Sequence, residues 1–147
     1  MVLQLATTIL KGEEQFVGCC GYSWHLGLPF GVLDYDLARC YWKQGIMTEA
    51  VQALLRFGFE VRNLHRVEAR VRLGNEASMR LLQRLGFQEE GRLRECLFLN
   101  NHFFDVKIFS RLKSEYRKST SQPAESANLR KSRIKCAFTS NYAHLLL

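Results

Sequence analysis

The sequence has few of the features that define several protein classes. It has two prolines among 147 residues, Pro29 and Pro123, so regular elements can run through most of the chain. It also has no apolar stretch of the roughly 20 residues that a membrane-spanning helix needs. Its first ten residues include neither a cationic leader nor a small-residue cleavage site. We therefore expect a cytoplasmic protein that neither enters a membrane nor carries a secretory signal.

Cysteine is present, but not in a pattern that serves a metal or a disulfide framework. The chain has an odd number of cysteines, at Cys19, Cys20, Cys40, Cys96 and Cys136. Adjacent cysteines in a strand point to opposite faces, and no group of cysteines has metal-ligand spacing. We expect reduced thiols and no bound metal.

The net charge of +7 is unevenly distributed. Residues 1–116 carry 15 Lys and Arg against 13 Asp and Glu, whereas residues 117–147 carry 6 against 1. The excess therefore belongs mostly to a Ser-rich final segment, which we expect to be a flexible basic tail. Because the rest of the chain is nearly balanced, we do not expect a specific nucleic-acid partner.

Hydrophobic periodicity predicts the order β-β-β-α-β-α-β-β. Alternating residues such as Val67, Ala69 and Val71 indicate strands, and the spacing of Val51, Leu54 and neighbouring apolar residues indicates a helix. The expected strands are 3–10, 16–24, 32–41, 66–73, 93–99 and 103–112, and the expected helices are 48–62 and 75–85. A strand-helix-strand unit among mostly antiparallel neighbours predicts one mixed sheet with helices on its faces.

The turn before the first helix is a candidate anion site. Gly45 lies between a strand and the helical pattern, where backbone N–H groups and the helix dipole favour a phosphate. Thr48 can cap this helix, and Glu49 suits its first turn. A single glycine before a helix is by itself also typical of an ordinary turn, so the phosphate interpretation depends on the motifs that follow.

Several linked motifs resemble one enzyme superfamily. Trp42-Lys43-Gln44-Gly45-Ile46-Met47 matches a phosphate-binding turn of the pattern Gln/Arg-x-x-Gly-x-Gly/Ala, and Thr48-Glu49-Ala50 follows as usual in one branch. Asn75, Ser78 and Gly86-Phe87 match its second signature. Over about residues 5–116 the chain resembles the GNAT superfamily of acetyl-CoA-dependent N-acetyltransferases, closest to the branch that acetylates ribosomal-protein N-termini. The resemblance implies an α/β (α+β) fold with a mixed, mostly antiparallel GNAT-type sheet flanked by helices.

The sequence departs from this family in three places. The family places a strand and a pair of helices before the region where this chain begins, so residues 1–116 are expected to form a GNAT domain that lacks those elements. An exposed sheet edge would follow, which a partner copy in a homodimer could cover. The branch commonly has Gly where this chain has Lys43, which could pair with a phosphate or restrict the turn. Residues 117–147 do not resemble the family.

The resemblance implies acetyl-CoA as co-substrate and assigns a set of residues to it. The turn would hold the pyrophosphate through backbone N–H groups, and the end of the preceding strand would hydrogen-bond the pantetheine arm. The implied cofactor-binding residues are Tyr35, Asp36, Leu37, Trp42, Lys43, Gln44, Gly45, Ile46, Met47, Thr48 and Asn75. From the residues alone, Tyr35 and Trp42 are read first as packing residues and second as lining an acyl pocket, and Asn75 can also cap the second helix.

Two residues are candidates for the chemistry that the family performs. By resemblance, Ser78 can donate a proton to the departing thiolate, although it can also be only the third residue of its helix. Glu68 can act as a base on the incoming amine through water. The alternative for Glu68 is a solvated strand residue paired with an arginine of matching parity, such as Arg66 or Arg70.

These residues predict an N-acetyltransferase that transfers an acetyl group directly to a primary amine. The expected acceptor is a protein or peptide N-terminal α-amine, with a small amine as the alternative. The elements expected to be missing and the unlike final segment also fit a different class of function, a non-catalytic, acyl-CoA-binding remnant of a longer enzyme.

Overall fold

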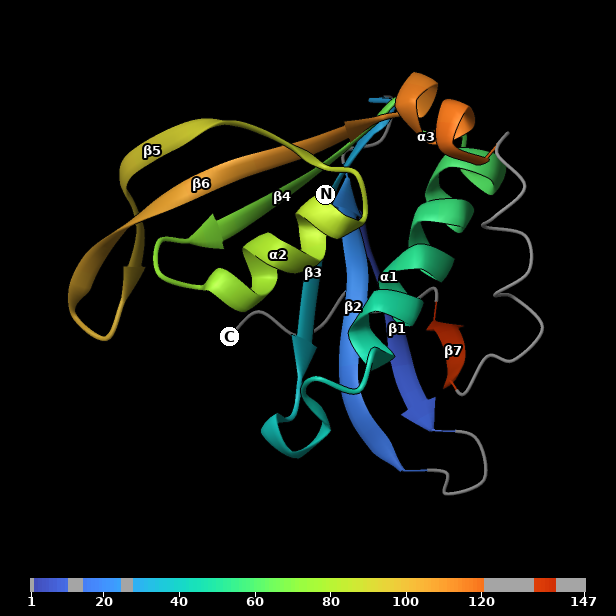
Figure 1. Ribbon diagram of the computed structural model, residues 1–147, viewed down its shortest axis with the longest axis horizontal. Helices are drawn as coiled ribbons and strands as arrows, with labels where there is room; N and C mark the ends of the chain where they lie inside the picture. The colour runs from blue at the N-terminus through green and yellow to red at the C-terminus, as the bar shows by residue number, and fades with distance from the viewer. Residues whose placement is uncertain (1, 11–14, 25–27, 121–133, 140–147) are drawn as a thin grey trace.

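A seven-stranded mixed sheet organises the molecule (Figure 1), in the strand order β5-β6-β4-β3-β2-β1-β7. The computed structural model describes residues 2–10, 15–24, 28–120 and 134–139. The strands are β1 Val2–Leu10, β2 Phe16–Trp24, β3 Phe30–Leu37, β4 Arg66–Arg72, β5 Gln88–Leu99, β6 His102–Leu112 and β7 Ile134–Thr139. The helices are α1 Ile46–Arg56, α2 Glu76–Arg84 and α3 Lys113–Thr120, with a 3-10 turn Arg39–Tyr41 and a π-helical segment Phe57–Val61. The expected fold class is confirmed.

One face of the sheet carries the core. Both α1 and α2 lie on the near side of the sheet in Figure 1, and their apolar residues join one buried cluster with those of β3 and β4. Alternation along β4 sends Val67, Ala69 and Val71 into this cluster. The Tyr22 hydroxyl, buried beneath α1, donates to the Leu54 carbonyl at 3.0 Å and joins β2 to that helix.

Two boundaries around α1 differ from the sequence prediction. The strand expected to reach residue 41 ends at Leu37 and gives way to the 3-10 turn, because Tyr41 N–H donates back to the Ala38 carbonyl at 3.0 Å. The helix begins at Ile46 rather than at Thr48. Its N-cap is Gly45, so the expectation that Thr48 caps this helix is wrong. Glu49 does lie in the first turn, as expected.

The second helix has the ends that the sequence predicts. The Asn75 side chain accepts a hydrogen bond from the Ser78 amide at 3.2 Å, as an N-cap does. At the other end, Gly86 has a φ of 76°, its amide donates to the Gln83 carbonyl and the Phe87 amide donates to the Leu82 carbonyl. These two bonds form a Schellman motif, which fixes the path from α2 into β5.

Strands β3 and β4 are parallel neighbours that pair over only part of their length. Phe30–Leu33 pairs with Arg66–Ala69. Beyond this ladder, β3 continues to Leu37 and β4 to Arg72. In Figure 1 the carboxyl end of β3 lies near the start of α1, and the carboxyl end of β4 lies beside α2. The pairing therefore stops at the place where both crossover helices bring their N-termini.

Part of the segment expected to be a flexible tail forms regular structure. Strand β7 pairs antiparallel with β1, from Leu5 opposite Thr139 to Leu10 opposite Ile134. The edge of β1 that was expected to be exposed is therefore covered by a later part of the same chain. Residues 121–133 and 140–147 of the expected tail lie outside the described residues.

Among the residues that the structure describes, none of the helices is both long enough and apolar enough to cross a membrane.

Candidate functional site

The segment between β3 and α1 is held in place by its own side chains. The Trp42 indole N–H donates to the Leu37 carbonyl at 2.7 Å, and the side-chain amide of Gln44 (Nε2) donates to the Cys40 carbonyl at 3.1 Å. The Arg39 guanidinium lies 5.6 Å from the centre of the Trp42 ring. Trp42 is half exposed, so its role here is to brace the turn through the indole N–H rather than to fill the core.

Two residues of this turn have left-handed backbone conformations. Lys43 has a φ of 61° and Gly45 a φ of 79°. Glycine adopts this region without steric cost, whereas lysine does not. A Cβ built on Gly45 would meet nothing within 4 Å, so the space beside this backbone is open. The turn therefore presents main chain, rather than side chain, to whatever approaches α1.

The N-terminus of α1 presents backbone amides at this open side. The first bond of the helix runs from the Glu49 amide to the Gly45 carbonyl at 3.1 Å, so the amides of Ile46, Met47 and Thr48 precede the intrahelical ladder. The side chains of Ile46 and Met47 are buried. Of the predicted cofactor residues, these two can therefore act only through their main chain. The arrangement fits a phosphate, because N–H groups and the helix dipole point the same way.

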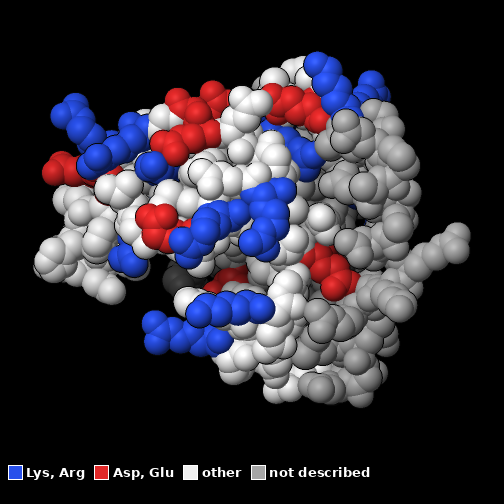
Figure 2. All heavy atoms as spheres, in the orientation of Figure 1, with Lys and Arg blue, Asp and Glu red and all other residues white. Residues whose placement is uncertain are grey.

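Basic side chains lie on both sides of this region. Figure 2 shows Lys and Arg on both sides of a hollow between α2 and the segment that follows β3, with Asp and Glu side chains also at the hollow. Arg80 and Arg84 are exposed on α2, and Arg39 and Lys43 are exposed on the other side. Cationic side chains beside the hollow would attract an anionic ligand, in addition to the backbone amides at the N-terminus of α1.

Ser78 and Tyr35 meet directly. The Tyr35 hydroxyl on β3 and the Ser78 hydroxyl on α2 are 2.5 Å apart, and either can be the donor. Burial raises the pKa of the Tyr35 hydroxyl above its ordinary value, although the hydrogen bond with Ser78 acts in the opposite direction. Tyr35 therefore stays protonated at neutral pH and is able to donate.

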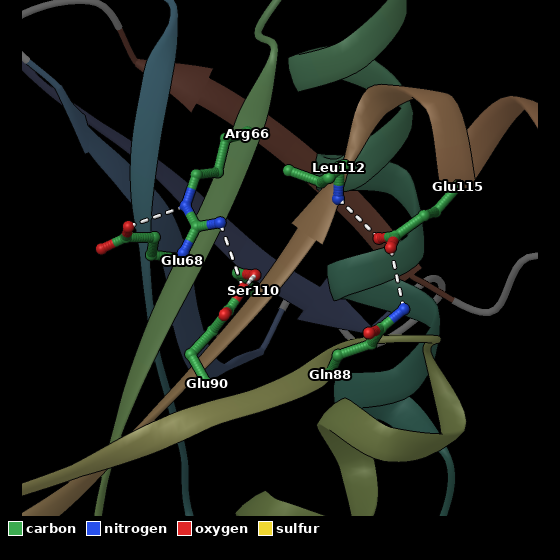
Figure 3. Close-up of polar contacts among 7 residues, drawn as sticks. All are labelled: Arg66, Glu68, Gln88, Glu90, Ser110, Leu112 and Glu115. Atoms are coloured by element: carbon green, nitrogen blue, oxygen red, sulfur yellow. Dashed lines mark hydrogen bonds and ion pairs between the residues drawn. The ribbon is translucent and has the colours of Figure 1, made fainter.

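Glu68 lies in a charged cluster on β4, β5 and β6 (Figure 3). Its carboxylate accepts from Arg66 Nε at 2.8 Å, and Arg66 Nη1 lies 3.2 Å from the Glu90 carboxylate. The Ser110 hydroxyl also donates to Glu90. Hydrogen bonds from Ser110 and then from Arg66 lower the pKa of Glu90. Glu68 is therefore paired with Arg66, as expected under the alternative in which it is an arginine-paired strand residue.

The sheet separates the two predicted catalytic residues. Ser78 reaches Tyr35 from the face that α2 covers, whereas Glu68 alternates with the buried Val67 and Ala69 and points to the other face. A reaction that uses both residues therefore needs substrates that meet in the opening where β3 and β4 stop pairing. A substrate that contacts Glu68 would enter from the face opposite Ser78.

Asp34 is a residue near the site that sequence reasoning missed. It follows Leu33, which pairs with Ala69, and therefore lies on the Glu68 face of β3. Its carboxylate accepts from the Ser23 hydroxyl at 3.4 Å, and burial raises its pKa above the ordinary value. Alternation alone could place Asp34 on one face of its strand. The register between the parallel strands, which sets Val32 opposite Glu68 and leaves Asp34 two residues further along, has no signal in the sequence.

The structure gathers most, but not all, of the predicted site residues. The turn residues 42–48, Asn75, Ser78 and Tyr35 surround the N-termini of α1 and α2 on one face of the sheet. Asp36 is exposed and Leu37 half-buried at the end of β3. Glu68 faces the other side of the sheet, and so does Asp36, which alternates with Tyr35 and Leu37 along β3.

The described residues contain no group of three or more His, Cys, Asp or Glu side chains placed to hold a metal ion.

Comparison with known proteins defines the class to which this fold and site belong. The model of a family described as "Acetyltransferase (GNAT) domain" matches residues 3–88, more than half of the chain. The chain belongs to the GNAT acetyltransferase family.

Three relatives illustrate the range within the family. An uncharacterized N-acetyltransferase, p20, of Bacillus licheniformis is 40% identical over 110 residues, which are 74% of this chain and 61% of the relative. A spermidine N(1)-acetyltransferase of Vibrio cholerae is 33% identical over 73 residues, 50% of this chain and 42% of that protein. The structure of a ribosomal-protein-S5-alanine acetyltransferase from Vibrio fischeri superposes with a TM-score of 0.69 at 29% identity, covering 76% of this chain and 63% of that one. The chain thus spans less than two thirds of each of these relatives.

Proposed function

We propose that the chain binds acetyl-CoA and transfers its acetyl group directly to a primary amine. The observation that carries this proposal is the position of the α1 N-terminus. Its leading amides and the open Gly45 backbone lie at the end of β3, whose pairing with β4 has stopped, and the Ser78 hydroxyl lies at the next helix along. A phosphate at the amides would let the rest of the ligand extend along β3 towards Ser78.

The chemistry requires a thioester, a neutral amine and a proton for the leaving thiolate. In the transfer, a bond forms between the amine nitrogen and the acetyl carbon, and the carbon–sulfur bond breaks. Ser78 would give its hydroxyl proton to the thiolate sulfur and be reprotonated from solvent. The amine would lose a proton to water held by Glu68. Family membership and the location of Ser78 at the N-terminus of α2 support the assignment of the acid.

The base assignment has a competing structural role. Glu68 already accepts a hydrogen bond from Arg66 at 2.8 Å, so a water bound to Glu68 would share the carboxylate with the guanidinium. Its position on the face opposite Ser78 supports the base role, because an amine entering there would approach the acetyl group from the side away from the thiolate.

For the acceptor we propose a protein or peptide N-terminal α-amine. The support is the likeness to the ribosomal-protein-S5-alanine acetyltransferase of Vibrio fischeri. The spermidine N(1)-acetyltransferase of Vibrio cholerae favours a small amine as the second candidate. The same face of β3 and β4 carries Asp34, Asp36 and Glu68 together with Arg66, Arg70 and Arg72, so its charges do not separate the two acceptors.

Two measurements test the proposal in sequence. Thermal unfolding of the full chain with increasing acetyl-CoA should show a rise in the midpoint, because a ligand that binds the folded state stabilises it. S-acetyl-pantetheine, which lacks the phosphates, is the control and should have a smaller effect. An absence of stabilisation by acetyl-CoA at millimolar concentration would contradict the phosphate site.

Turnover is then measured as release of free CoA thiol with a panel of acceptors. We expect release with peptides that begin with alanine and less with spermidine. The reverse preference would reassign the acceptor. Binding without release for any amine would support the non-catalytic remnant instead of the enzyme.

A further inference from the structure

The contact between Tyr35 and Ser78 determines where the Ser78 hydrogen can point. A serine hydroxyl has one hydrogen and can donate one bond at a time. With the two oxygens 2.5 Å apart, one hydroxyl donates and the other accepts. If Ser78 donates to Tyr35, its hydrogen is already used. If Tyr35 donates, the Ser78 hydrogen is available for another acceptor.

We propose that Tyr35 is a positioning residue that donates its phenolic hydrogen to Ser78 Oγ and so directs the Ser78 hydrogen towards the leaving sulfur. This inference rests on the proposed function, in which Ser78 is the acid. Tyr35 does not itself exchange a proton with the substrate in this arrangement. It fixes the rotamer and the hydrogen-bond direction of the residue that does.

The surroundings of both residues hold the two hydroxyl groups in contact, and the phenol, being the more acidic of the two, is the stronger hydrogen-bond donor. Tyr35 is packed against the core cluster, so its ring is held while the hydroxyl reaches α2. The Ser78 amide is anchored by the Asn75 side chain at 3.2 Å, which fixes the backbone beneath the hydroxyl. A serine in the first turn of a helix can otherwise donate its hydroxyl hydrogen to a nearby backbone carbonyl. A donor hydroxyl at Ser78 Oγ holds the side chain away from that alternative.

A double-mutant cycle on kcat tests the coupling between the two residues. Tyr35→Phe should lower kcat about tenfold and change the KM for acetyl-CoA by less than about twofold, because only orientation of the acid is lost. In a Ser78→Ala background, Tyr35→Phe should change kcat by less than about twofold. If the two losses instead multiply, Tyr35 acts independently of Ser78 and the proposal is overturned.

The matched control is Tyr116→Phe. It removes the same hydroxyl group from a tyrosine that donates to Glu60 at 2.7 Å, on α3 and away from the site. We expect its kcat to stay within about twofold of the unsubstituted chain. A loss equal to that of Tyr35→Phe would show a general effect of removing a tyrosine hydroxyl and would overturn the proposal.

Failure of the proposed function looks different from failure of this inference. If the unsubstituted chain releases no thiol, or if Ser78→Ala keeps full kcat, the enzyme or its acid is wrong. If Ser78→Ala impairs the chain and Tyr35→Phe does not, only the inference about Tyr35 is wrong.

A second measurement is independent of turnover. In a Ser78→Cys variant, a hydrogen bond donated by Tyr35 would stabilise the thiolate and lower the pKa of the introduced thiol. Its alkylation by iodoacetamide at pH 7, resolved by mass spectrometry from that of the native cysteines, should slow about threefold or more when Tyr35→Phe is added. The Tyr116→Phe substitution should leave the rate unchanged. An equal or faster rate with Tyr35→Phe would show that Tyr35 does not donate.

Discussion

At position 43 the chain has a lysine in a backbone conformation that suits glycine. Its φ of 61° lies in the left-handed region, where the Cβ of an L-residue comes too close to the following carbonyl oxygen. The residue is exposed, so packing does not compensate for this strain. A glycine at this position would adopt the same conformation without that clash. Lys43 is therefore either tolerated or retained for its charge.

Replacing Lys43 with glycine should stabilise the fold. We expect Lys43→Gly to raise the free energy of unfolding by about 0.5–1 kcal/mol, because relief of left-handed strain exceeds the added entropy of the unfolded chain. Urea denaturation measures the difference. Lys43→Ala is the matched control: it removes the same charge but keeps the Cβ, and should leave stability nearly unchanged. If both variants bind acetyl-CoA more weakly at low salt, the ammonium pairs with a phosphate.

For single residues, the sequence predicts the features that depend on residues nearby in the chain. The Asn75 cap and the glycine at the end of α2 follow from residues within one turn of each other, and both are confirmed. The bond between Tyr35 and Ser78 spans 43 positions and depends on where α2 crosses the sheet. Side-chain alternation assigns a face to Glu68, but only the three-dimensional arrangement shows that Ser78 lies on the other one.

The hairpin of β5 and β6 projects beyond the helices (Figure 1). Its strand pairing contains a break in register, where the side-chain carboxylate of one residue accepts hydrogen bonds. The register shifts between Leu93 and Leu97. There the Asp105 carboxylate accepts from the Glu95 amide at 2.8 Å and from Arg92 Nε at 2.7 Å. These bonds, the backbone one first, lower the pKa of Asp105. The sequence predicts the Asn100-Asn101 turn from its composition, but a bulge has no comparable signature.

The stabilising effect of Asp105 should depend on pH in a defined direction. Because the folded state lowers the pKa of this carboxyl, its contribution is present above the unfolded value of about 3.9 and is lost as pH falls through the folded value. Asp105→Asn should therefore melt at a lower temperature than the unsubstituted chain at pH 6. The gap between the two melting temperatures should narrow progressively below about pH 4. A gap that persists unchanged to pH 2 would show that packing, rather than charge, is responsible.

For the whole molecule, the two outer strands of the sheet differ in how they are formed. At one edge lies β5, whose residues are exposed along its entire length. At the other edge lies β7, a strand from late in the sequence that pairs with β1. The central β-α-β-α order was predictable because each element has its own periodicity. β7 was not predictable, because its six residues gain their structure from pairing with a strand more than a hundred residues earlier.

Removing β7 should uncover the edge of β1. We expect a chain that ends after Thr120 to lose about 1–3 kcal/mol of stability, since six cross-strand pairs disappear. It should also self-associate with increasing concentration, because an unpaired strand edge is a template for another chain. Light scattering after size-exclusion chromatography measures the association. A chain that ends after Thr139 keeps β7 and should behave as the full chain does. Equal behaviour of the two truncated chains would show that β7 does not protect this edge.

The short ladder between β3 and β4 has a consequence for how this molecule can change over time. Under the proposed function, a ligand that enters where the ladder stops is recognised by backbone N–H groups, which every residue except proline supplies. Substitutions in the turn, such as a lysine in a place that suits glycine, can then accumulate without altering which cofactor is recognised. Under the proposed function, selectivity for the amine would have no such protection, because it would depend on side chains of the opposite face such as Asp34 and Glu68. Relatives that keep the same turn are therefore free to diverge in the amine that they accept.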